Sequence, residues 1–392
     1  MIHGVACHVA GRAFWLAIAY NSCSTCRMSV GADQILNFFY VFGASFALSV
    51  VLVFARVGRG SADLTAVQAS HTRATSRLGG VAVFAAVFAG TWFWFSSPSV
   101  SSSYQLFLLA SAPLFVAGVA EDLGYPTGVR LRLVAAVVSG GAFVAAFGQW
   151  LPRLDIPILD LAMAVPLFAI PFTVVACAGV THAFNLIDGL NGLSSFVSIG
   201  VAMSLMAICA QVGLWAHFQA LGLLLAAVAG FLVVNFPFGR VFLGDGGAYV
   251  VGHILVWTSV SIVWNAPDVS AFAILLIFFW PIADTLLAVW RRTVRGADMT
   301  RPDRLHFHQL VMRGLEIAVL GRGRRSLANP LAATVIVPMA IVPMFLGALF
   351  YDNVAATAWL SLYAFLSFFL TYLAGMHWSR RGRGRGRGRG RV

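Results

Sequence analysis

Three aspartates each follow a long apolar stretch of this sequence, where a carboxylate can bind a metal ion or handle a proton. They are Asp122 in Gly-Val-Ala-Glu-Asp, Asp188 in Asn-Leu-Ile-Asp-Gly-Leu-Asn-Gly, and Asp245 in Phe-Leu-Gly-Asp-Gly-Gly. A later apolar stretch is followed by a segment containing His306 and His308. Carboxylate oxygens bind Mg²⁺ together with substrate phosphates, and His or Arg can hold phosphate oxygens. These residue types together predict phosphoryl transfer.

The elements that must position these residues are membrane-spanning helices. Hydrophobic residues make up 60% of the 392 residues and charged residues only 10%, against roughly 25% charged in soluble globular proteins. This composition excludes an ordinary cytosolic enzyme, a disordered protein and a disulfide scaffold. Runs of about 20 apolar residues are long enough to span a bilayer as helices. We predict an all-α polytopic integral membrane protein with about 11 transmembrane helices, at 34–55, 78–96, 103–120, 133–150, 158–180, 193–213, 215–235, 247–265, 269–290, 329–350 and 354–376.

The arginines predict how these spans are oriented. All 26 basic residues are Arg, and all but Arg12, Arg27 and Arg153 lie after odd-numbered spans or in the C-terminal tail. Basic connections mark the cytoplasmic side. We therefore expect a multi-pass protein of the bacterial inner (cytoplasmic) membrane, with its N-terminus outside and its C-terminus cytoplasmic. Because every second span returns the chain to one face, the three aspartates should converge in a cytoplasmic active site.

One transmembrane domain over 31–378 is expected, with cytoplasmic loops at 56–77, 121–132, 181–192, 236–246 and 291–328. Residues 1–30 form an N-terminal extension, which is either an upstream start before Met28 or a weak signal-like segment. Residues 379–392 repeat Arg-Gly and are predicted to be a disordered tail. We expect the tail to anchor the cytoplasmic end, and we expect no nucleic acid partner.

Six segments with polar and glycine residues follow one another between about residues 70 and 310. They are Arg77-Leu-Gly-Gly80 with His71 before it, Glu121-Asp122, Asn185 to Leu193, Asn235-Phe-Pro237 with Phe242-Leu-Gly-Asp245, Pro281-Ile-Ala-Asp-Thr285, and Pro302-Asp-Arg-Leu-His306-Phe-His308. In this order they resemble the polyprenyl-phosphate N-acetylhexosamine-1-phosphate transferases, glycosyltransferase family 4. The first resembles that family's Pro-Arg-x-Gly-Gly segment, the second stands where the family has paired aspartates, and the third resembles Asn-x-x-Asp-Gly-x-Asp-Gly-Leu. The fourth resembles an Asn-x-Pro and Phe-x-Gly-Asp element, the fifth is a familiar run, and the sixth resembles a histidine motif.

The resemblance implies an Mg²⁺-dependent reaction, with Mn²⁺ as an alternative ion. A membrane-bound polyprenyl (undecaprenyl) phosphate would attack the sugar-linked phosphate of a UDP-N-acetylhexosamine and release UMP. The implied metal ligands are Asp245 and Asp122, and Asp122 alternatively activates the lipid phosphate. The implied catalytic residues are Asp122, Asp188, Glu121, His306 and His308, and the implied substrate-binding residues are Arg77, Asn185, Asn235, Arg301 and Arg304.

Departures from the family pattern favour the O-antigen branch over the phospho-N-acetylmuramoyl-pentapeptide transferases of peptidoglycan synthesis. Gln309 stands where the peptidoglycan type has a further histidine, and the loop near Arg77 lacks that type's Thr-Pro-Thr-Met-Gly-Gly pattern. Glu121 and Asn191 each replace a family aspartate. The sugar and the oligomeric state stay open, although the resemblance allows a homodimer.

Two alternative functions, a transporter and a structural scaffold, explain the sequence less well. A lipid-linked sugar transporter or flippase should carry an inverted repeat and charges near the midplane of several spans, whereas only Asp284 lies deep in a predicted span. For Asp284 itself, a structural hydrogen bond and a role in the site both remain open. A structural scaffold explains neither the ordered motifs nor the shared face of the aspartates.

Overall fold

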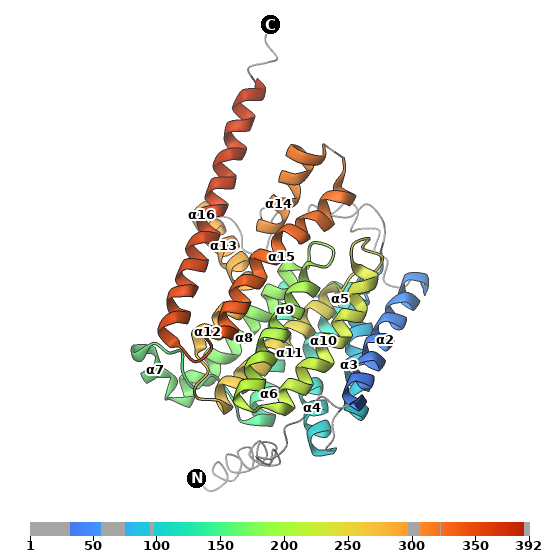
Figure 1. Cartoon of the computed structure of the whole chain (residues 1–392), viewed down its shortest axis with the longest axis vertical. Helices are drawn as coiled ribbons and strands as arrows, with labels where there is room; N and C mark the ends of the chain where they lie inside the picture. Colours follow the sequence, from blue (N-terminus) through green and yellow to red (C-terminus); the bar gives the residue numbers. More distant parts are fainter. Residues whose placement is uncertain (1–31, 56–74, 95–97, 297–305, 322, 388–392) are drawn as a thin grey trace.

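The structure is a computed structural model that describes residues 32–55, 75–94, 98–296, 306–321 and 323–387. The described chain folds into a bundle of helices (Figure 1). The N-terminal extension 1–30 lies outside these residues. The helices are α2 (Ala32–Ala55), α3 (Gly79–Trp94), α4 (Pro98–Ala110), α5 (Ala112–Asp122), α6 (Val129–Phe147), α7 (Pro157–Met163), α8 (Pro166–Ile187), α9 (Leu193–Val212), α10 (Trp215–Asn235), α11 (Gly244–Asn265), α12 (Ala271–Ile277), α13 (Phe279–Arg295), α14 (Phe307–Leu315), η2 (Glu316–Leu320), α15 (Arg325–Leu349) and α16 (Val354–Arg387).

The helices confirm an all-α polytopic membrane protein, with fewer uninterrupted spans than the sequence predicts. Among the described residues, 8 helices are long and apolar enough to cross a membrane, or up to 10 if two bent pairs each form one span. The pairs are α4 with α5, bent by 49°, and α12 with α13, bent by 79°. The predicted span 78–96 corresponds to α3, an apolar helix shorter than the other candidates.

Prolines explain both bends. Pro113 and Pro281 lie in the first turns of α5 and α13. A proline lacks the backbone N–H, and its ring clashes with the carbonyl four residues earlier, which favours a break at these positions. α8 and α15 nevertheless continue through internal prolines. The bend before α13 redirects the helix that carries Asp284.

Several predicted boundaries differ from the structure. The predicted loop 291–328 contains α14 and η2, and the predicted span 158–180 is divided between α7 and α8. The span predicted to end at residue 180 continues as α8 to Ile187, since polar His182 and Asn185 still lie on a helix packed inside the bundle. The tail predicted to be disordered from residue 379 is helical as far as Arg387. Once a helix is nucleated, each added residue gains one hydrogen bond, so α16 can extend past its apolar part.

α11 is the centre of the bundle. Its spanning segment is buried along its whole length, and it packs against α3, α5, α8 and α9. Glycines let these helices approach at its N-terminus: a Cβ on Gly80 would lie 2.1 Å from Cα of Gly247, and one on Gly118 would lie 2.5 Å from Cα of Gly246. This close packing brings the ends of α3 and α5 against the start of α11.

We expect Gly80→Ala to lower the free energy of unfolding by about 1–3 kcal/mol, the usual cost of overpacking a close contact. The added methyl group meets backbone, which cannot move aside as a flexible side chain could. Denaturant titration of the detergent-solubilised protein checks this. The control is Gly141→Ala on α6, where a Cβ meets nothing within 4 Å; equal stability losses in the two variants would contradict the proposed packing.

Candidate active site

A short backbone pairing fixes Arg77 beside the start of α11. The segment before α3 runs alongside residues 241–243: Phe242 N donates to Ser76 O (2.8 Å), Gly79 N to Phe242 O (2.9 Å) and Gly80 N to Leu243 O (2.8 Å). Gly244 has a φ of +74°, and a Cβ there would lie 1.9 Å from Arg77 O. Only glycine fits this turn, which leads directly into Asp245.

Asp122, at the end of α5, caps the N-terminus of α11. Its Oδ1 accepts a hydrogen bond from Asp245 N and its Oδ2 accepts one from Gly246 N, both at 2.9 Å. Its side chain is 1% exposed. The first amides of a helix have no partner within the helix, and negative charge is favourable at that end. Asp122 therefore ties α5 to α11, while its predicted metal and catalytic roles stay predictions.

Asp245 lies between two arginines, one from the segment before α3 and one from α6. Arg77 Nη2 donates to its Oδ1 at 2.8 Å, and Arg132 Nη1, from α6, donates to its Oδ2. Arg77 Nε also lies 3.3 Å from Asp122 Oδ1. The two guanidinium groups thus join α3, α5, α6 and α11 at one end of the bundle.

Asp188 is the third carboxylate at this end. It follows α8 and lies close enough to Arg77, Asp245 and Asp122 for their charges to act on it. Burial raises the pKa of Asp188 well above its usual range, Arg77 opposes that rise, and the two other carboxylates add to it. Together with Arg132, the described residues of this cluster number three carboxylates and two guanidinium groups.

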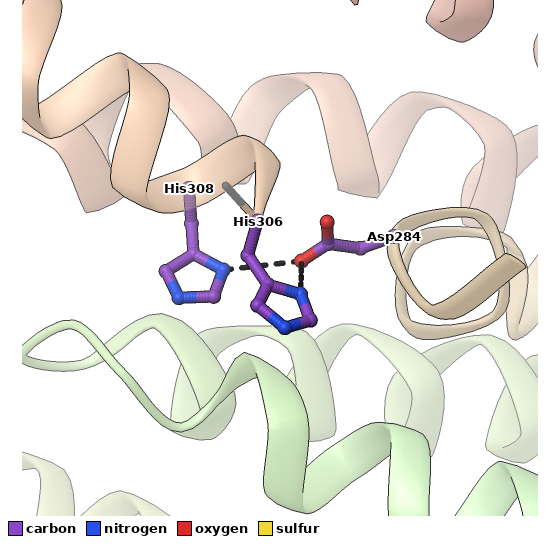
Figure 2. Close-up of side chains that lie close together, drawn as sticks. All are labelled: Asp284, His306 and His308. Carbon is purple, nitrogen blue, oxygen red and sulfur yellow. Dashed lines mark hydrogen bonds and ion pairs between the residues drawn. The ribbon is translucent and has the colours of Figure 1, made fainter. Parts of the chain in front are cut away.

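The predicted histidines meet Asp284 rather than Asp245. His308 Nδ1 lies 3.1 Å from Asp284 Oδ2, and His306 Nδ1 lies 3.5 Å from the same oxygen (Figure 2). A Cβ on Gly189 would lie 2.6 Å from His308 Nε2, so the histidine segment reaches the loop that carries Asp188. The glycine after Asp188 is needed for this close approach.

Of the remaining predicted residues, Asn235 and Glu121 hold loops of the site together through hydrogen bonds. Asn235 Oδ1 accepts from Gly192 N, and Asn235 Nδ2 donates to Val241 O, both at 2.7 Å, so this amide joins two loops of the site. Glu121 accepts from Thr127 N (2.8 Å) and Oγ1 (2.6 Å) and braces the α5–α6 loop. Asn185 is partly exposed near the end of α8. The predicted sugar-binding residues Arg301 and Arg304 lie outside the described residues.

Arg132 is a site residue that sequence reasoning missed. At the start of α6 it looks like any basic residue that marks the cytoplasmic side of a span. Only the three-dimensional structure separates it from Arg130: Arg132 is partly buried and pairs with Asp245, while Arg130 is exposed. The order of motifs gave no indication of it.

Comparisons with known proteins find sugar-phosphate transferases. The family model described as glycosyl transferase family 4 matches residues 104–263. The chain is 27% identical to the probable undecaprenyl-phosphate N-acetylglucosaminyl 1-phosphate transferase of Bacillus subtilis, over 64% of this chain and 70% of the relative. It is 28% identical to the undecaprenyl-phosphate alpha-N-acetylglucosaminyl 1-phosphate transferase of Yersinia pestis (70% and 75% covered) and 29% identical to that of Thermotoga maritima (68% and 78%).

The matched residues contain Asp122, Asp188 and Asp245, together with Arg132. The relatives bear the names of the N-acetylglucosaminyl branch, which the departures near Arg77 and Gln309 favour over the peptidoglycan branch. Residues 104–263 therefore match glycosyl transferase family 4, and the chain is a phosphotransferase with several membrane-spanning helices.

Proposed function

We propose that the chain transfers an N-acetylhexosamine 1-phosphate from a UDP-sugar to a polyprenyl phosphate. A lipid phosphate oxygen attacks the sugar-linked phosphorus, the bond from that phosphorus to the bridging oxygen breaks, and UMP leaves with that oxygen. The product is a polyprenyl-diphosphate sugar. The relatives are named for undecaprenyl phosphate and N-acetylglucosaminyl 1-phosphate, so undecaprenyl phosphate and UDP-N-acetylglucosamine are the first substrates to test.

One observation carries this proposal: Asp245 lies between Arg77 and Arg132, at the end of the buried helix α11. A phosphomonoester is already ionised near neutral pH, because its second pKa is about 6. The lipid phosphate therefore needs little help from a base, and the larger barrier is repulsion between two anions. Guanidinium groups at the end of membrane helices can hold both phosphates and reduce that repulsion.

The donor set of the site fits Mg²⁺. Asp245 and Asp188 would supply hard oxygen ligands, the kind that Mg²⁺ prefers, from neighbouring positions in the cluster. Asp122 is a weaker candidate ligand, because both its oxygens already accept backbone amides. When bound, Mg²⁺ supplies neutralisation of phosphate charge. Arg77 and Arg132 would then move from Asp245 toward the phosphates.

We also propose that the site faces the cytoplasm of a bacterium, with the N-terminus outside and the C-terminus inside. The support is the arginine distribution: Arg77, Arg132, Arg291 and Arg325 all belong to the connections or helix ends on this side. Nucleotide sugars are cytoplasmic substrates, so this orientation matches the proposed donor. The reaction would be the first step of a surface polysaccharide such as O-antigen.

The test is UMP release by the purified full chain in detergent. The substrates are polyprenyl phosphate and a panel of UDP-N-acetylglucosamine, UDP-N-acetylgalactosamine and their 6-deoxy relatives. We expect release with at least one donor, and only when lipid phosphate and Mg²⁺ are both present. No release with any donor, or equal release without the lipid, would contradict the proposal; a lipid-linked sugar transporter or a scaffold gives the first of these results.

A further inference from the structure

Asp284 is a fully buried carboxylate on α13, whose hydrogen bonds and ion pairs among the described residues join it to residues 306–308. An ionisable group within a membrane helix is expensive unless it has partners, and here both oxygens have them. Oδ1 accepts from Phe307 N at 2.9 Å, and Oδ2 faces Nδ1 of His308 and of His306 (Figure 2). One side chain thus holds three consecutive residues of the histidine segment.

The first of these contacts docks α14. Phe307 is the first residue of that helix, and the preceding residue, His306, makes no side-chain capping hydrogen bond in the described chain. The carboxylate of α13 supplies the missing acceptor, and its charge lies at the favourable end of the helix dipole. Asp284 therefore fixes where α14 begins relative to α13.

The other contacts orient the imidazoles: His308 Nδ1 is hydrogen-bonded to Asp284 Oδ2 at 3.1 Å, and His306 Nδ1 lies 3.5 Å from the same oxygen. The two rings are stacked, with centroids 5.5 Å apart and planes inclined by 22°, and both direct Nδ1 at the same oxygen. A carboxylate that accepts from Nδ1 keeps the proton on that nitrogen and leaves Nε2 on the opposite edge of the ring. In Figure 2 both Nε2 edges point away from Asp284.

The Nε2 edge of His308 reaches the Asp188 loop. A Cβ on Gly189 would lie 2.6 Å from Nε2 and 3.2 Å from Cδ2 of that ring. His308 is 1% exposed, so its ring has little room to turn elsewhere. His308 therefore contacts the buried carboxylate of Asp284 through Nδ1 and the residue beside Asp188, Gly189, through its Nε2 edge.

We propose that Asp284 is a positioning residue that holds His306 and His308 with their Nε2 atoms toward the Asp188–Gly189 loop, where they bind the diphosphate of the sugar-nucleotide donor. This inference rests on the proposed function. The same three side chains have ligand atoms within 4.8 Å of one another, a spacing that a metal ion could use. The backbone amide on Oδ1 and the shared Nδ1 contacts favour the hydrogen-bonded arrangement, so bound metal is an outcome of the test.

Asp284→Asn is the test variant, and Asp155→Asn is its matched control. Asp155 is also a carboxylate that accepts from the first amide of another helix, Ala271 N of α12 (2.6 Å), and it also pairs with a basic group, Arg153. We expect Asp284→Asn to raise the donor KM about 10- to 100-fold, the usual value of hydrogen bonds to charged groups. Asp155→Asn should change stability only.

The effect should disappear when the histidines are absent. In a His306→Ala, His308→Ala background, Asp284→Asn should leave the donor KM unchanged, because a positioning residue acts only through its partners. Three results would overturn the proposal. The effects of Asp284→Asn and of the histidine substitutions on the donor KM could be fully additive, or Asp284→Asn could differ from wild type only in stability. The purified protein could also contain a stoichiometric transition metal.

A readout without substrate separates this inference from the proposed function. Isotope-labelled histidine, assigned with His306→Ala and His308→Ala, should show the His308 ring protonated at Nδ1 in wild type and not in Asp284→Asn. If the protein releases no UMP with any donor, the proposed function fails and the diphosphate assignment fails with it. The labelled spectrum still decides the positioning: an Nε2-protonated His308 ring in wild type would overturn it.

Discussion

Asp245→Asn should reduce UMP release about 10³-fold while the protein stays folded. A bound cation and its charge neutralisation are worth several kcal/mol to a phosphoryl transfer, and each 1.36 kcal/mol is a factor of ten in rate. The substitution keeps the size of the side chain but removes the charge that faces Arg77 and Arg132. Steady-state UMP release checks the rate, and a denaturant titration checks the fold.

Asp268→Asn is a suitable control for that variant, because it removes an acid from the loop between α11 and α12, at the other end of α11. It should release UMP at the wild-type rate. If Asp245→Asn retains more than about a tenth of wild-type activity, the carboxylate is not central to the reaction, and the site must lie elsewhere on this end of the bundle.

Asp122→Ala should have the second large effect, and this effect should be on stability as well as on activity. The substitution leaves Asp245 N and Gly246 N buried without their acceptor. Each unsatisfied buried donor costs about 1–3 kcal/mol, so we expect the free energy of unfolding to fall by about 3 kcal/mol. Denaturant titration of the solubilised protein measures it.

Asp122→Asn separates the cap from a direct chemical role. The amide keeps one acceptor for the α11 amides, so its stability loss should be smaller than that of the alanine variant. If Asp122→Ala matches wild type in stability yet loses activity, the capping role is wrong and Asp122 acts on substrate or metal alone.

The sequence predicted that the three aspartates lie near one another, because every second membrane span returns the chain to the same face. Asp122, Asp188 and Asp245 follow the predicted third, fifth and seventh spans, so they return to one end however the helices pack. The separate roles of the three aspartates depend instead on how the helices pack. Asp122 caps a helix 123 positions later in the chain, and that contact requires the close approach of Gly118 to Gly246.

The role of Asp284 and the C-terminal end of α8 could not be predicted from periodicity and composition. A single acid in an apolar run fits a buried hydrogen bond as well as a functional role, and only the positions of His306 and His308 separate these readings. Polar His182 and Asn185 resemble a loop in composition, yet they belong to α8. The interior of a helix bundle can supply hydrogen-bond partners for polar groups. A hydropathy pattern does not show those partners, so it places the end of such a helix too early.

The most direct test of a cation site centred on Asp245 is Mg²⁺ binding measured by isothermal titration calorimetry on purified wild type and Asp245→Asn, each with the UDP-sugar donor present. We predict saturable binding to wild type and an affinity at least about tenfold lower for the variant. Equal Mg²⁺ affinity in the two proteins would contradict the account and remove Asp245 from the metal site.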